Sequence, residues 1–89
     1  MENNTVDLTK WIETTLKGKL DDAIVEVHDM SGSGEHFQAQ IIAPAFEGRS
    51  IVEQHRIVFD ALGDAMKAKI HALSIKTMTP TEWEKFKKI

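Results

Sequence analysis

The middle of the chain alternates strand-like and helix-like segments in an order that few folds accommodate. Residues 36–43 alternate apolar and polar side chains, residues 50–68 have a helical spacing, and residues 70–77 are again typical of a strand. A strand that returns to its sheet through a helix lies parallel to the first strand, with a right-handed connection. We therefore predict that the strands over 36–43 and 70–77 run parallel and begin at the same end of one sheet.

A β-hairpin is predicted to precede this unit. The β-rich run over 23–28 is followed by a short connection whose residues 31–34 are only Ser and Gly, a composition typical of a hairpin loop. Pro44 is expected to end the second strand, because it lacks the N–H group that a strand ladder uses.

Both ends of the chain predict a helix. The first is expected to begin at Asn4 or Thr5 and to continue until Gly18, with apolar residues at helical spacing. The Thr-Pro-Thr-Glu run at 79–82 combines a helix cap, a Pro at the first helical position and a Glu at the third. It predicts a short last helix, which carries Trp83 and Phe86.

The central helix has its own start signal. Ser50 and Glu53 have the spacing of a capping box, and the helix is expected to continue to about Ala68, with Gly63 as a dividing point. Its predicted core stripe consists of Ile51, Val58, Leu62 and Ala65 or Met66, with His55 in the middle.

These elements give the order αββαβα, an α+β fold with a three-stranded mixed sheet. A chain of 89 residues supports one domain over 1–89, and surface scaling implies that folding buries about 64% of its surface. The core is therefore expected to be thin.

The chain contains no Cys. This excludes disulfides, a cysteine nucleophile, a zinc ribbon and any iron–sulfur site ligated wholly by this chain. The N-terminus has no secretory signal pattern and no apolar run approaches membrane length, so we expect a cytoplasmic protein without a membrane association.

The charge is unevenly distributed. The formal net charge of −3 disfavours a protein whose main task is to bind nucleic acid phosphates. Residues 67–89, however, hold six Lys and two Glu. This basic segment is either a solvated surface or a docking site for an anionic group.

Histidine is the main chemical resource, since imidazole binds transition metals. His36 begins the second strand and His71 the third, so parallel strands bring both to one rim of the sheet. Strict alternation, however, places His71 in phase with Leu73, and His36 in phase with Gln38. The two imidazoles converge only if the strand ends twist.

The other histidines are weaker candidates. His28 ends the first strand and flanks the same loop as His36. His55 is expected to be a core histidine of the central helix. No nucleophile, base and acid constellation accompanies Ser33 or any other residue, so the sequence does not predict an enzyme.

Nucleic-acid binding is the alternative. With a bend at Gly63, the central helix resembles a helix-turn-helix in which Arg56, Lys67 and Lys69 would contact DNA or RNA phosphates. Three basic residues form a small electrostatic footprint, and acidic residues lie among them.

Five segments in this order resemble the BolA family, most closely the subgroup that includes IbaG. They are GEHF at 34–37, FEGR at 46–49, EQHRIV at 53–58, IHALSIKT at 70–77 and TPTEW at 79–83. The resemblance covers nearly the whole chain. It implies a BolA-like fold similar to class II KH domains.

The resemblance also implies a function. Family members are non-enzymatic partners of monothiol glutaredoxins, with which they form heterodimers that share a two-iron two-sulfur cluster. The implied ligands are His71 and a residue before the second strand, where other members have a Cys-Gly-x-x-Phe arrangement. Here the segment is Ser-Gly-Glu-His-Phe at 33–37, so we assign His36, with His28 in reserve.

A shared cluster would take its sulfur ligands from the glutaredoxin and from glutathione. We therefore expect no stable cluster on the isolated chain. The family is also linked to transcription regulation, but the segment 62–65 has one Gly and an Asp where a KH domain has its Gly-x-x-Gly loop. A homodimer is compatible with the sequence.

Overall fold

The computed structural model describes residues 8–30, 36–63 and 72–87. The expected helix start at Asn4 or Thr5 and the residues of the 31–34 loop lie outside this part of the chain. The same holds for Ala65, Met66 and Ala68, at the expected end of the central helix.

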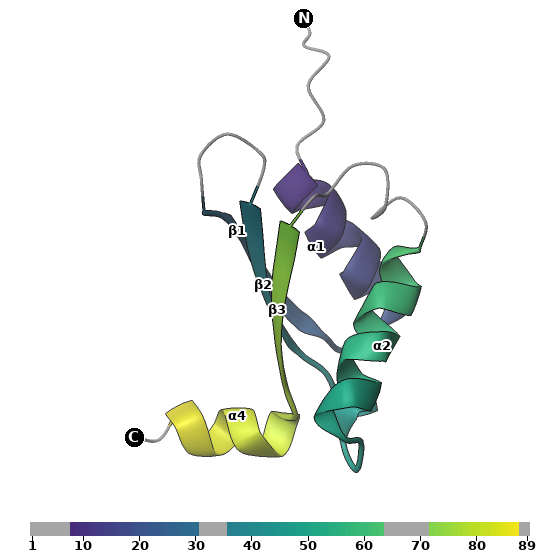
Figure 1. Cartoon of the computed structure of the whole chain (residues 1–89). Coiled ribbons are helices and arrows are strands. Elements are labelled where there is room, and N and C mark those ends of the chain that lie inside the picture. The colour runs from purple at the N-terminus through teal and green to yellow at the C-terminus, as the bar shows by residue number, and fades with distance from the viewer. Residues whose placement is uncertain (1–7, 31–35, 64–71, 88–89) are drawn as a thin grey trace, which may run out of the picture.

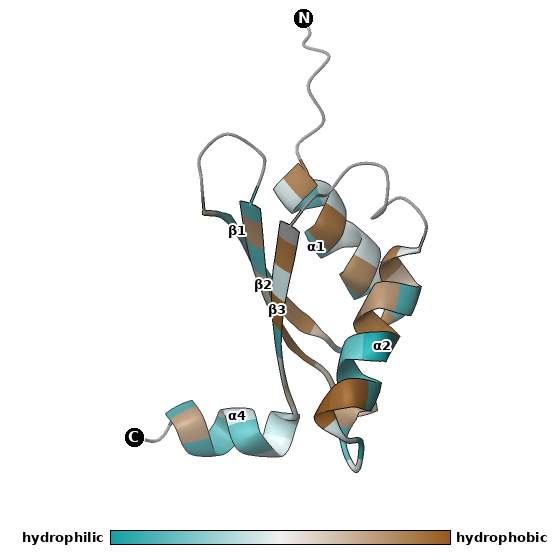
Figure 2. Cartoon of the chain, in the orientation of Figure 1, coloured by the Kyte–Doolittle hydropathy of each residue, from teal (hydrophilic) through white to brown (hydrophobic). Residues whose placement is uncertain are grey.

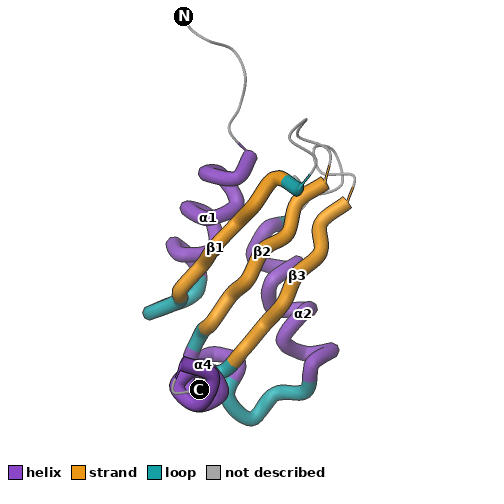
Figure 3. Tube along the Cα trace, turned by 90° about the vertical axis from the view of Figure 1, so that its left-hand side faces the viewer, coloured by secondary structure: helices purple, strands orange, loops and turns teal. Residues whose placement is uncertain are grey.

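Three strands form one mixed sheet in the order β1-β2-β3 (Figure 3). They are β1 Ile24–Asp29, β2 His36–Ile42 and β3 Ala72–Met78. β1 and β2 pair antiparallel, with Asp29 opposite Phe37. β2 and β3 pair parallel, with His36 opposite Ala72. The predicted hairpin and the predicted parallel crossover are both confirmed.

Two helices cover one face of this sheet (Figure 1). They are α1 Leu8–Lys19 and α2 Ile51–Leu62. Apolar residues concentrate on these helices and on the strands beneath them (Figure 2). The largest fully buried side chains come from both layers and from the β2–α2 connection: Phe46, Ile12, Leu16, Ile41 and Val58.

α2 begins as predicted and ends just before Gly63, the predicted dividing point, while the rest of the predicted helix lies outside the described part of the chain. The Ser50 hydroxyl accepts from the Glu53 backbone N–H (3.2 Å), and a Glu53 carboxylate oxygen accepts from the Ser50 N–H (2.9 Å). The helix ends at Leu62, because Gly63 takes a φ of 72° that a helix does not allow, and its N–H still closes the last turn on Phe59.

Two expected helix features are wrong in detail. α1 continues through Gly18 to Lys19, and the N–H of Leu20 closes one more turn on Leu16 (2.9 Å). In α2, Ile51 is 58% exposed at the beginning of the helix, whereas Gln54, one turn on, is buried.

The buried Gln54 side chain joins three segments. Its Nε2 donates to the carbonyls of Phe46 (3.3 Å) and Arg49 (3.0 Å), and its Oε1 accepts from the Thr77 hydroxyl (2.5 Å). The amide therefore connects α2 to β3 and to the turn after η1, a 3₁₀ helix at Pro44–Phe46. Pro44 opens η1 just after β2, as expected of a strand-ending residue.

The last helix, α4 Pro80–Lys87, projects from the face of the sheet opposite to α1 and α2 (Figures 1 and 3). Its predicted start is confirmed: Thr79 and Glu82 form a reciprocal capping box. Thr81 adds a bond from its hydroxyl to Glu47 (3.0 Å). None of the residues of α4 is buried.

Replacing Thr77 by Val tests the Gln54 bond. The variant keeps the shape of the side chain but leaves the buried amide oxygen without its donor, and we expect a loss of about 1–3 kcal/mol in the free energy of unfolding. Urea denaturation measures the loss. Thr81→Val, which removes an exposed bond, is the control, with an expected change within about 0.5 kcal/mol. Equal losses would contradict the assigned role of Gln54.

The capping box of α2 predicts that the stability of the folded chain depends on pH. The bond from the Ser50 N–H lowers the pKa of Glu53 below its ordinary 4.5. Ionised Glu53 therefore stabilises the folded chain above the unfolded-state pKa, and this stabilisation disappears as pH falls through the folded-state value. We expect Glu53→Gln to melt at a lower temperature than the parent chain at neutral pH. In thermal melts at decreasing pH the difference should shrink; a growing difference would refute this role.

Candidate functional site

The sheet has one covered and one open face. Along β2, Phe37, Ala39 and Ile41 are buried under the helices, whereas His36 and Gln38 are exposed on the other side. Register places Ser74 and Lys76 of β3 beside this second set, and both are exposed. We call the side that carries His36, Gln38, Ser74 and Lys76 the open face.

His36 lies at one rim of the open face. It is the first residue of β2, and its carbonyl accepts from the N–H of Met30 (2.7 Å), which closes the hairpin beyond β1. Its partner across the parallel ladder is Ala72, the residue that follows His71 in the sequence. The imidazole is exposed and makes no hydrogen bond or ion pair with the described residues.

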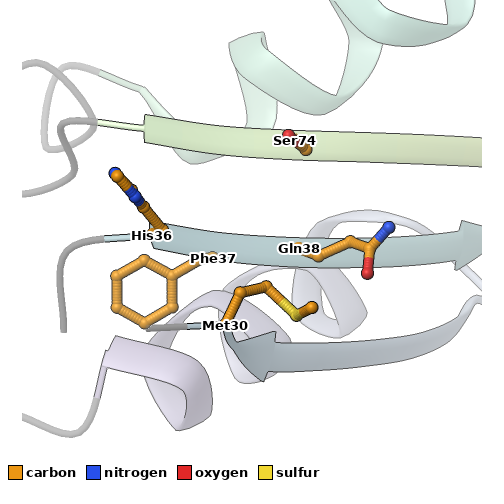
Figure 4. Close-up of a pocket in the computed structure, with 5 residues that line it drawn as sticks. All are labelled: Met30, His36, Phe37, Gln38 and Ser74. Carbon is orange, nitrogen blue, oxygen red and sulfur yellow. The ribbon is translucent and has the colours of Figure 1, made fainter. Parts of the chain in front are cut away.

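A pocket of about 430 Å³ lies at this rim (Figure 4). Its lining comes from β2, from β3 and from the residue that follows β1: Met30, His36, Phe37, Gln38 and Ser74. Figure 4 shows the imidazole of His36 pointing past the beginning of β2, with Met30 and Gln38 farther along the sheet. An imidazole nitrogen, a thioether, an amide and a hydroxyl thus border one space.

His28 lies on the same face as His36. It sits opposite Gln38 on β1, and its Nε2 is 3.9 Å from a carboxylate oxygen of Glu26. Both of these side chains are largely exposed. The reserve ligand is therefore near the rim, offset from His36 by two residues along the strands.

The remaining sequence candidates divide between the covered face and the undescribed segments. His71 and Ser33 lie outside the described residues, so convergence of His71 with His36 stays a prediction. His55 belongs to α2, on the opposite side of the sheet from the open face, and it is half-buried rather than the core residue expected. The turn of the helix brings Gln54, not His55, against the core.

Of the three basic residues proposed to contact nucleic acid, Arg56 lies in the described part of the chain. Arg56 is exposed on α2, on the covered side of the sheet, among exposed Glu53 and Asp60. Lys67 and Lys69 lie outside the described residues. The likeness to KH domains also stays a prediction.

Sequence reasoning missed the pocket residues Met30, Gln38 and Ser74. The alternation along β2 and β3 carried the signal for Gln38 and Ser74, since both are in phase with His36 once the register is known. Within the described residues, no group of three or more His, Asp or Glu side chains could hold a metal ion, and no helix is long and apolar enough to cross a membrane.

Comparisons with known proteins agree on one family. The family model described as "BolA-like protein" matches residues 13–82. The Arabidopsis thaliana protein BOLA2 is 43% identical over 75 residues, which cover 82% of this chain and 80% of that protein. SufE-like protein 1, chloroplastic/mitochondrial, of the same plant is 40% identical over 86 residues, which are 80% of this chain but 23% of that protein.

A solved structure extends the likeness to the fold. The BolA domain of SufE1 from Arabidopsis thaliana superposes with a TM-score of 0.76 and 36% identity, covering 88% of this chain and 98% of that domain. The α+β fold with its three-stranded mixed sheet is thus that of BolA structures. The matches do not separate subgroups, so the likeness to the IbaG subgroup stays a prediction.

The placement of two histidines predicts different effects on stability. The His36 side chain is exposed and makes no hydrogen bond within the described part of the chain, so we expect His36→Ala to change the free energy of unfolding by less than about 0.5 kcal/mol. His55 is half-buried on α2, and its truncation should cost about 1 kcal/mol. Urea denaturation of both variants measures this, and the reverse order would contradict the placement.

Proposed function

The chain belongs to the BolA-like family, and from this premise we propose that it is a non-enzymatic partner of a monothiol glutaredoxin. In this proposal the two proteins form a heterodimer that binds, transfers or senses a two-iron two-sulfur cluster, which is cargo of the pair. His36 and His71 are the proposed ligands from this chain, and His28 is the reserve.

The observation that supports this proposal is the position of His36. Its imidazole is exposed at the beginning of β2, is not bonded to other described residues, and borders a pocket of about 430 Å³. A ligand for a cluster carried by another protein needs this accessibility. The parallel register adds that Ala72, next to His71 in sequence, lies opposite His36.

The donor chemistry fits an iron site with mixed ligands. Since the chain has no Cys, the sulfur ligands would come from the glutaredoxin and from glutathione. Two imidazoles on one iron resemble the ligand set of a Rieske centre, which has a higher reduction potential than an all-thiolate cluster. A neutral imidazole nitrogen is required for binding, so acid favours release. A site that releases its cluster in this way suits the transfer or sensing of a cluster.

The test is a titration of cluster-loaded monothiol glutaredoxin with this chain under anaerobic conditions, followed by visible circular dichroism. We expect a new spectrum that saturates at one to one. His36→Ala and His71→Ala should abolish it, because each removes an iron ligand. His55→Ala is the matched control from the other side of the sheet and should keep it.

Two outcomes would contradict the proposal. One is an unchanged spectrum with the glutaredoxin homodimer intact, after which binding of DNA or RNA becomes the function to test, through its salt dependence and through Arg56, Lys67 and Lys69. The other is a stoichiometric cluster on the isolated chain after reconstitution with iron and sulfide, which would remove the need for a partner.

A further inference from the structure

α4 contributes no buried side chain to the hydrophobic core. It has eight residues, none of them buried, although it carries two aromatic rings. Trp83 and Phe86 stack on each other with centroids 5.9 Å apart, and Phe86 is 56% exposed. Isolated helices of this length are marginal in water. The capping box at Thr79 and the bond from Thr81 to Glu47 nevertheless hold its beginning in place.

The direction of α4 gives the open face a wall. The helix leaves the end of β3 on the side opposite to α1 and α2, and two views turned by 90° agree on this (Figures 1 and 3). The open face and α4 together form an L-shaped surface, which we call the cradle. Its floor is the open face, and its wall is α4.

Exposed apolar residues mark both ends of the cradle. Ile24, at the beginning of β1, pairs with Ile42 at the α4 end of the sheet and is 46% exposed. Phe86 stands on the wall at the same end. Met30, 62% exposed, lies at the His36 rim. Between them the floor offers hydrogen-bonding groups from Gln38, Ser74 and Lys76.

The size of the cradle identifies the kind of occupant. Three strands about 4.8 Å apart and up to seven residues long give a floor of roughly 14 by 23 Å, or about 300 Å². The eight-residue helix α4 is about 12 Å long and roughly 10 Å wide, so one side of it adds about 120 Å². The total is below the roughly 600 Å² per partner that separates transient complexes from stable ones. A partner that binds, exchanges cargo and leaves fits this surface better than a permanent subunit.

The geometry points to the cradle as the docking surface for the cluster-carrying glutaredoxin, with Phe86 and Ile24 as apolar anchors at the end away from His36. This inference rests on the proposed function. The floor is continuous with the pocket of His36, and the six residue steps of β2 separate the rim from the wall by about 20 Å. The apolar anchors and the proposed iron ligand therefore lie at opposite ends of one surface.

The experiment measures binding of the cluster-free glutaredoxin to the full chain by isothermal titration calorimetry, and the visible spectrum of the loaded pair separately. Phe86→Glu should weaken the cluster-free complex about tenfold or more, as the loss of an aromatic anchor does. Ile24→Glu, on a different element, should weaken it in the same direction. His36→Ala should abolish the spectrum of the loaded pair.

Phe59→Glu is the matched control, since Phe59 is also exposed but belongs to α2 on the covered side. Unchanged affinity in Phe86→Glu and Ile24→Glu, with the cluster spectrum still formed, would overturn the cradle and leave the proposed function standing. A loss in Phe59→Glu alone would move docking to α2. Absence of both binding and spectrum in the parent chain would reject the proposed function itself.

Self-association is checked in the same series. Sedimentation of the chain alone should be unaffected by Phe86→Glu. If Phe86→Glu instead dissociates a homodimer of the parent chain, the cradle is occupied by a second copy, and the inference is wrong. Circular dichroism in the far ultraviolet verifies that each variant keeps its helices.

Discussion

The buried amide of Gln54 is the contact on which the arrangement of the sheet depends. A side chain that is 4% exposed must satisfy its polar atoms within the protein, and this one does so with two carbonyls of the β2–α2 connection and the hydroxyl of Thr77. These bonds fix the beginning of the crossover helix to the end of the strand that it leads to. A shift of β3 by one residue would remove Thr77 from Gln54 and turn every β3 side chain to the other face.

The register held in this way determines what the rim contains. With Thr77 opposite Ile41, His36 lies opposite Ala72, and Gln38 lies beside Ser74. The hairpin then adds Met30, whose N–H bonds the His36 carbonyl. The parallel register thus brings Ser74 to the pocket beside residues 36–38, and the hairpin brings Met30.

The sequence predicted the elements and their order because periodicity and capping involve residues that are close in sequence, and because the crossover rule applies to any strand-helix-strand unit. Ser50 with Glu53, and Thr79 with Glu82, were visible as spacings. Gln54 was not, because its burial depends on partners five, eight and twenty-three residues away. Periodicity therefore assigned the first core position of α2 to Ile51 and gave His55 a core role. For the site, the sequence predicted His36 at the rim of parallel strands, whereas Met30 and Ser74 became visible only with the register.

The division of the open face into a ligating end and an apolar end has a physical rationale if the chain acts with a cluster-carrying partner. Imidazole ligands bind iron only when neutral, so their contribution to affinity changes with pH. Apolar anchors such as Phe86 contribute through buried area, which does not titrate. A complex that combines the two keeps its partner bound while the ligation changes.

Since the anchors lie about 20 Å from His36 along β2, a partner can contact α4 without any contact at the rim that carries His36. Recognition of the partner and exchange of its cargo are then separate steps on one surface.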